Sequence, residues 1–217
     1  MKKPLQLMRI SLLSAALGLA ATLSLPAQAA TDEQLLPIQH QWAKIQYDLP
    51  EKERAGAFAT LADVIEAARD KYPGDTELLI WQGIVVSSQA GAEGGLGALK
   101  LAKQARKLFE QAIKQNPAAL NGSALTSLGT LYHKIPGWPL GFGDDKKAAE
   151  LFKQALEISP DGLDTNYFYG SYLLDEGDRA AARAALQKAL AAPPRPQRPK
   201  ADAGRRQEVE QLLDTLS

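Results

Sequence analysis

Cysteine is absent from the 217-residue chain. Its absence excludes disulfide bonds, a thiol nucleophile, thiolate metal ligands and lipid attachment to an N-terminal cysteine. Histidine is rare, because His40 and His133 are the only two, and neither has a second histidine or a glutamate near it at metal-ligand spacing. The Gly-x-Ser-x-Gly motif of a nucleophile elbow is missing as well. We therefore predict no catalytic residue, no metal site and no cofactor, and we expect that the protein is not an enzyme.

An excess of charge of one sign is also missing, because the chain has 25 basic and 25 acidic side chains. A nucleic-acid-binding domain normally carries a basic excess, so we predict no nucleic-acid partner. Lys2, Lys3 and Arg9 are the only charged residues of positions 1–29, and removal of that segment would leave a net charge of −3. The mature protein is then mildly acidic.

Positions 1–29 have the pattern of a cleaved secretory signal. Three basic residues precede an apolar run over 10–25, and Ala27 and Ala29 form an Ala-x-Ala cleavage site. The run is shorter than the roughly 20 apolar residues that cross a bilayer, which disfavours an uncleaved membrane anchor. No later stretch is long and apolar enough to cross a membrane. We predict a soluble protein of the bacterial periplasm that is not a lipoprotein, with secretion from the cell as the alternative.

Sequence features that are typical of β-strands are few in this chain. Runs of β-branched residues are scarce, alanine and leucine are abundant, and tight Asn-Gly turns between strand-like segments are missing. We therefore predict an all-α fold. Ala155 and Pro160 recur 34 residues later as Ala189 and Pro194. Repetition at this period predicts stacked helical hairpins, each ended by a proline that stops its second helix.

The repeat pattern predicts one domain over residues 30–194, built from about four hairpins at 32–73, 76–117, 121–160 and 164–194. Residues 195–217 are predicted to form a Pro-rich connector and a C-terminal helix. We expect this helix to cap the open end of the stack, with Arg205 and Arg206 on its polar outer face.

The last hairpin shows the repeat most clearly. Small residues at Gly170, Ala182 and Ala189 let its two helices approach closely, and Leu186 fills the space between them. With Pro194, these residues resemble the tetratricopeptide repeat. The earlier hairpins match this pattern at Ile65, Ala68, Pro73, Gly83, Ala105, Phe109, Ala112, Pro117, Gly129, Tyr132, Ala148, Phe152, Ala155 and Pro160. The resemblance implies a right-handed superhelix whose concave surface binds partners without chemistry.

Two hairpins are longer than the repeat. Pro73 and Pro117 are 44 residues apart, and Pro117 and Pro160 are 43 residues apart. The surplus falls between the two helices of each hairpin, at 91–97 and 136–143, where glycine or proline is dense. We predict two long loops at the same edge of the stack, on a face that often binds ligands in repeat proteins.

The loop at 136–143 carries Trp138 and Phe142, two large aromatic residues that a plain connector does not need. One hypothesis is that they form part of a pocket with Tyr132, Tyr167 and Tyr169, and of these residues Tyr132, Trp138, Phe142 and Tyr167 are the candidate ligand- or partner-binding residues. The alternative is a structural plug, in which both aromatic side chains pack into the neighbouring repeat.

Other conspicuous residues are predicted to be structural. Trp42 and Trp81 lie in first helices, where large side chains pack inside their own hairpin. Asp144 and Asp145 precede a helical pattern, where a carboxylate caps free backbone N–H groups and suits the helix dipole.

Two functional hypotheses follow. The first is a periplasmic adaptor or scaffold that binds a protein or peptide partner through its concave surface. The second is a small-ligand-binding accessory protein. The long loops and the helix at 145–152 are similar to the T-component proteins of tripartite (TRAP) substrate-transport systems, periplasmic helical-repeat proteins that work beside a solute-binding subunit. That resemblance implies an organic acid or a lipid-like molecule in an apolar pocket under the Trp138 loop.

Overall fold

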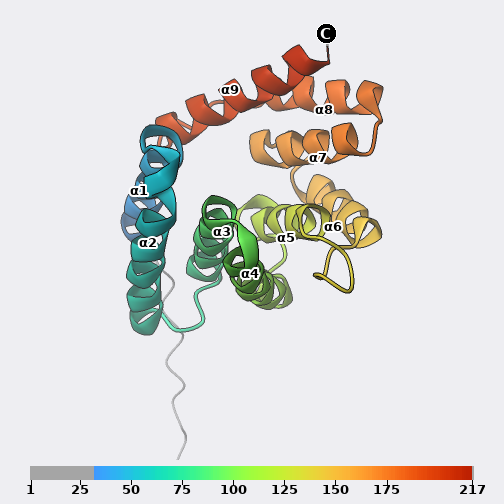
Figure 1. The fold of residues 1–217 in the computed structure, drawn as a ribbon. Coiled ribbons are helices and arrows are strands. Elements are labelled where there is room, and N and C mark those ends of the chain that lie inside the picture. Colours follow the sequence, from blue (N-terminus) through green and yellow to red (C-terminus); the bar gives the residue numbers. More distant parts are fainter. Residues whose placement is uncertain (1–31, 217) are drawn as a thin grey trace, which may run out of the picture.

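The helices alternate with short connections along the whole described chain. A computed structural model describes residues 32–216, so the predicted signal segment 1–29 lies outside the described residues. Its elements are α1 (Asp32–Asp48), α2 (Glu51–Lys71), α3 (Thr76–Glu93), α4 (Gly95–Gln115), the 3₁₀ turn η1 (Ala119–Gly122), α5 (Ser123–Lys134), α6 (Asp145–Ile158), α7 (Leu163–Asp175), α8 (Arg179–Ala191) and α9 (Pro199–Thr215) (Figure 1). No strand occurs in this part of the chain, which confirms the predicted all-α fold.

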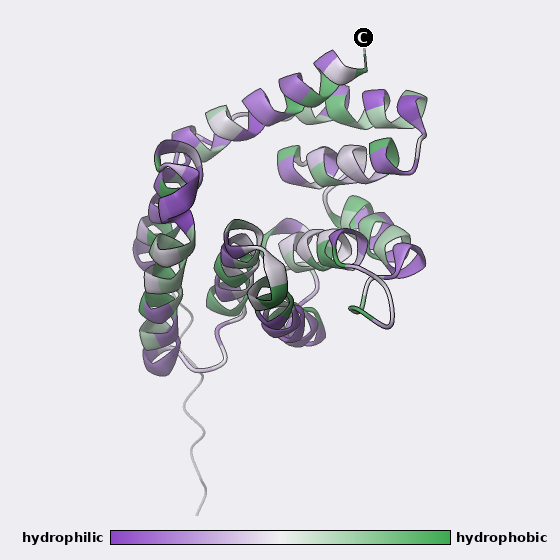
Figure 2. Cartoon of the chain, viewed as in Figure 1, coloured by the Kyte–Doolittle hydropathy of each residue, from purple (hydrophilic) through white to green (hydrophobic). Residues whose placement is uncertain are grey.

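Sequential helices pack against one another, most extensively α3 with α4, α2 with α3, α7 with α8 and α5 with α6, whereas α1 contacts α2 less. The helices follow one another along a curve (Figure 1). Hydrophobic residues lie mainly where helices face each other, and hydrophilic residues predominate along α9 (Figure 2). Within residues 32–216, no helix combines the length and apolar character that spanning a bilayer requires.

Small residues allow the close approach inside each pair. A Cβ atom at Gly170 would lie 2.8 Å from Cγ of Leu186, and one at Gly83 would lie 2.5 Å from the ring of Phe109. Both distances are shorter than carbon atoms tolerate, so glycine is required at these two positions. Leu186 and Phe109 are fully buried. The repeat pattern therefore predicted real contacts between the helices of a pair.

Aspartates begin three of the helices. The side chains of Asp75, Asp144 and Asp178 accept hydrogen bonds from the backbone N–H groups of Leu78, Lys147 and Ala181. Each bond satisfies a helix N–H that has no partner within its own helix. The predicted capping role holds for Asp144.

The predicted loop at 91–97 is wrong. Helix α3 continues to Glu93 and α4 begins at Gly95, so the chain reverses at Gly94 and Gly95, whose φ angles are 66° and 60°. Glycine adopts such positive angles without steric cost. The extra residues of this hairpin lengthen its helices instead, because α3 and α4 have 18 and 21 residues where α7 and α8 have 13 each. The segment between α5 and α6 is the true loop insertion.

The C-terminal helix does more than cap the last hairpin. Helix α9 contacts α7 and α8, as expected of a cap, and its first half also contacts α1 (Figure 1). Ala201 belongs to the core that includes Leu35 and Trp42 of α1, whereas Val209 belongs to the core of α7 and α8. Helix α9 therefore joins the last hairpin to the first and closes the curve into a ring.

Candidate functional site

The ring encloses a cavity of about 1050 Å³. Its wall is formed by the first helices of the hairpins, α1, α3, α5 and α7, with contributions from the start of α4, the 195–198 connector and α9. Contact of α9 with α1 adds a further wall to the concave surface of the helix stack and makes it a deep pocket that stays partly open to solvent. Pro136 and Leu140 of the α5–α6 loop also border it.

Two buried tryptophans form part of the wall. Trp42 and Trp81 lie with ring centroids 6.1 Å apart in an edge-on arrangement, and both are buried, as expected of core residues. The indole N–H of Trp42 donates to Oγ of Ser88 at 2.9 Å. The indole N–H of Trp81 has no acceptor among the described residues. An unpaired buried donor costs free energy, so the surroundings of Trp81 are short of an acceptor.

A cluster of charged side chains forms the wall of the cavity nearest α9. Its members come from α7, the connector and α9: Asp164, Arg195, Arg198, Asp202, Arg205, Arg206 and Glu208. Asp164 is central, because Arg195 Nη1 lies 2.5 Å from its Oδ2 and Arg205 Nε lies 2.8 Å from its Oδ1. Burial raises the pKa of the Asp164 carboxyl, but the positive charges of Arg205 and Arg195 outweigh burial and hold it well below its usual value.

Arg205 links this cluster to the aromatic residues of α7. Its guanidinium carbon lies 4.3 Å from the ring centroid of Tyr167 and 4.6 Å from that of Phe168. Cation–π contacts of this kind strengthen when the charge is shielded from water, and Arg205 is buried. Its predicted place on the outer face of the last helix is wrong, because the partner carboxylate Asp164 lies 41 residues away in the sequence and leaves no local pattern.

The four predicted binding residues do not share one site. Tyr132 is buried, and its ring meets that of Phe142 edge-on with centroids 5.6 Å apart. Tyr167 borders the central cavity. Trp138 is 89% exposed and does not line the cavity. Phe142 therefore packs against the protein, as the plug alternative proposed. Trp138 neither packs into the protein nor lines this cavity.

Backbone hydrogen bonds hold the loop that presents Trp138. The N–H of Gly143 donates to the carbonyl of Pro136 at 3.0 Å, and the N–H of Asp144 donates to the carbonyl of Tyr132 at 2.9 Å. A Cβ atom at Gly143 would lie 1.9 Å from the carbonyl oxygen of Ile135, so the closed loop requires glycine there. The loop is thus a fixed protrusion with an exposed indole.

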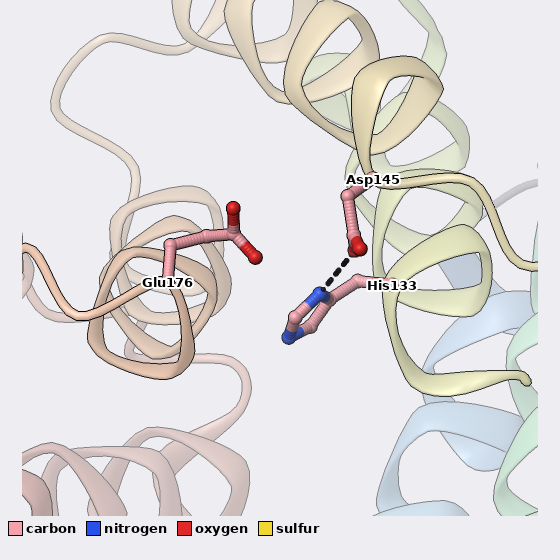
Figure 3. Close-up of side chains that lie close together, drawn as sticks. All are labelled: His133, Asp145 and Glu176. Atoms are coloured by element: carbon pink, nitrogen blue, oxygen red, sulfur yellow. Dashed lines mark hydrogen bonds and ion pairs between the residues drawn. The ribbon is translucent and has the colours of Figure 1, made fainter.

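The fold brings carboxylates to His133, which the sequence spacing did not predict. His133 Nδ1 lies 2.8 Å from Oδ1 of Asp145, and His133 Nε2 lies 2.9 Å from Oδ2 of Asp175. Figure 3 shows His133 beside Asp145, with Glu176, the residue that follows α7, facing them. Lys134 also pairs with Asp175. Each ring nitrogen of His133 thus has a carboxylate oxygen within hydrogen-bond distance, so we interpret the group as a polar clamp joining α5, α6 and α7.

This clamp gives a testable stability effect. Burial raises the pKa of Asp175, but its hydrogen bonds with Lys134 and His133 outweigh burial and lower it. We expect Asp175→Asn to reduce the free energy of unfolding by about 0.5–1 kcal/mol at pH 7, the range of exposed ion pairs. Because the folded-state pKa is depressed, this stabilisation exists above the unfolded pKa of about 4 and disappears as the pH falls below it. Urea unfolding at pH 7 and pH 3 measures the difference, and an equal loss at both values would contradict the clamp.

Comparison with protein families gives one match. Residues 163–196, which contain α7, α8 and the turn after them, match the family model described as tetratricopeptide repeat. No curated protein matches the chain significantly. A tetratricopeptide repeat indicates a role in protein–protein interaction. The last hairpin is thus similar to a tetratricopeptide repeat, and the all-helical architecture is consistent with a fold of this kind.

Proposed function

We propose that the chain is a non-enzymatic adaptor of the bacterial periplasm that binds a protein partner through the loop between α5 and α6, at the border of its concave face. The repeat at 163–196 supports an interaction role, and the pattern at 1–29 supports export. The observation that carries the proposal is the loop between α5 and α6. Trp138 and Leu140 are 89% and 73% exposed on it, and Leu140 borders the cavity. A large apolar side chain held out in water by a fixed loop is typical of a binding anchor.

The proposal is tested by crosslinking from the anchor. A photoreactive phenylalanine analogue in place of Trp138 should capture one partner protein in intact cells. The same analogue at Val64, an apolar residue that is 53% exposed on α2, serves as the control position. The purified partner should then bind the Trp138→Ala variant at least tenfold more weakly. Equal capture at both positions, or unchanged affinity of the variant, would remove the basis of the proposal.

The anchor role also predicts that Trp138 is dispensable for folding. Trp138→Ala should leave the far-UV circular dichroism unchanged and the free energy of unfolding within about 0.5 kcal/mol, as for surface substitutions. Phe142→Ala is the matched comparison. It removes the ring that packs on Tyr132 and should cost about 2 kcal/mol. Loss of helix in the Trp138 variant would show that this residue belongs to the core.

A second function, binding of a small ligand, is favoured by the closed ring. The cavity of about 1050 Å³ lies at the upper end of the roughly 300–1,000 Å³ of small-molecule sites. This candidate agrees with the similarity to T-component proteins, which would make the protein partner a solute-binding subunit. In a Trp138→Phe background, Trp42 and Trp81 are the remaining tryptophans, and both line the cavity. Their fluorescence should change with a ligand and stay constant with a partner docked only on the loop.

A further inference from the structure

The charged cluster at α9 is not balanced. Four arginines and three carboxylates compose it, which leaves one positive charge. Both oxygens of Asp202 are occupied, because Arg195 Nε lies 2.5 Å from Oδ1 and Arg206 Nε lies 3.2 Å from Oδ2. Both oxygens of Asp164 are likewise occupied by Arg195 and Arg205. The carboxylates of the cluster are therefore committed to three of its four arginines.

Glu208, the third carboxylate, is occupied as well. Its Oε2 lies 2.6 Å from Arg205 Nη1 and 3.5 Å from the hydroxyl of Tyr47. Arg198 is the arginine left over, and no ion pair to it occurs within residues 32–216. It begins α9 as the N-cap residue and lines the cavity.

The surroundings of Arg198 lack an acceptor. Its guanidinium carbon lies 5.1 Å from the ring centroid of Trp81, and in the described part of the chain neither Arg198 Nε nor the indole N–H of Trp81 has a hydrogen-bond partner. Trp81 is 3% exposed. Two neighbouring side chains thus hold two buried unpaired donors beside the same cavity, and one of them is a cation without a direct ion pair.

The pKa values of the arginines agree with the difference in ion pairing between Arg198 and the other arginines of the cluster. Burial, together with the positive charge of Arg195, lowers the pKa of Arg198 and outweighs its attraction to Asp164 and Asp202. Burial also acts to lower the pKa of Arg195 and Arg205, but attraction to Asp164 outweighs it and raises both. Arg198 is therefore the cation that an added negative charge would stabilise most.

The rest of the cavity wall is largely apolar, with polar side chains such as Ser88 and Thr126 among its lining residues. Ile84, Leu99, Ala102 and Leu131 contribute to it from α3, α4 and α5. We propose that the cavity binds an organic monocarboxylate with an apolar body, whose carboxylate is held by the Arg198 guanidinium beside Trp81. A planar guanidinium matches the two oxygens of a carboxylate, and one excess positive charge matches one negative charge. This inference rests on the small-ligand candidate above and names its ligand class.

The probe is decanoate, which has a carboxylate and an apolar chain. Decan-1-ol is the uncharged analogue with the same chain, and acetate is the carboxylate without the chain. Isothermal titration of the full mature chain at pH 7.5 should show decanoate binding at least tenfold more tightly than decanol, and no binding of acetate. Arg198→Gln should weaken decanoate at least tenfold and abolish the preference over decanol. Arg198→Lys, which retains the charge, should retain part of the preference. Arg179→Gln, at an exposed arginine of α8, should leave the affinity within twofold.

Stability separates a binding role of Arg198 from a structural one. Because Arg198 has no carboxylate partner, Arg198→Gln should change the melting temperature by less than about 3 °C without ligand. Equal affinity of decanoate and decanol, or full decanoate affinity in Arg198→Gln, would overturn the inference. A third result would also overturn it: a pentapeptide that ends in two leucines binds only when its C-terminal carboxylate is free, and decanoate does not bind. Absence of all binding, with the Trp138 crosslink present, would overturn this inference and leave the adaptor proposal standing.

Discussion

Replacement of Arg205 by alanine is expected to lower the free energy of unfolding by about 3 kcal/mol, near the lower end of values for breaking a buried ion pair because Asp164 is partly exposed. The substitution leaves Asp164 and Glu208 with fewer positive partners, and it removes the cation that packs on Tyr167 and Phe168. It also loosens the connection between α7 and α9, which helps to close the ring. Chemical denaturation at pH 7 measures the loss.

The effect of Arg205→Ala depends on pH in a definite direction. The folded-state pKa of Asp164 is depressed below its unfolded value, so its stabilisation is present above about pH 4 and is lost as the pH falls toward the folded-state pKa. The stability difference between the wild type and the variant should therefore shrink below about pH 4. Arg179→Ala, at an exposed arginine, should cost less than about 0.5 kcal/mol at any pH. A loss in Arg205→Ala no larger than in this control would show that the cluster contributes little to closure.

Introduction of tryptophan at Ala155 is expected to cost about 3 kcal/mol or more, at or beyond the upper end of overpacking effects. Ala155 is completely buried on α6, which packs between α5 and α7. The backbones are close there, because a Cβ atom at Gly129 of α5 would already lie 3.4 Å from the backbone of Ala148 and the side chain of Phe152. An indole can enter only if the helices separate.

The matched control is tryptophan at the neighbouring Gln154, which is exposed on the same helix. Gln154→Trp should leave the free energy of unfolding within about 0.5 kcal/mol, because its side chain points to solvent. Thermal denaturation followed by circular dichroism compares the two variants. Similar melting temperatures for both would mean that the α5–α6 and α6–α7 contacts are far more adaptable than close packing of small residues implies.

The ring closure changes what the repeat stack can bind. An open stack offers its concave surface to an extended partner, whereas contact between α9 and α1 encloses that surface around a cavity. The exposed Trp138 lies outside that cavity, on a loop that borders it through Pro136 and Leu140. The proposed partner site and the proposed ligand site are therefore distinct surfaces, and the two sets of variants test them separately.

Several features of the fold could be predicted from the residues alone. Glycine and alanine at Gly170, Ala182 and Ala189 recur in positions that only close helix packing uses, and the helix-ending prolines recur with them. Such patterns are local, since side chains three and four residues apart share one helical face whatever surrounds the helix. The glycines at 91–97 misled the prediction, because a single pair of positive φ angles at Gly94 and Gly95 reverses the chain without a loop.

The sequence by itself predicted the helical fold, the close packing of α7 on α8 and the insertion that carries Trp138, because periodicity, small residues and prolines act over a few turns. Only the tertiary structure decided that α9 reaches back to α1, that a cavity forms, and that Arg205 lies against Tyr167 while Arg198 lies against Trp81. Those contacts join residues far apart in the chain, as Arg205 and Asp164 are. Coulomb attraction and burial depend on distance in space, so they produce no periodic pattern in the sequence.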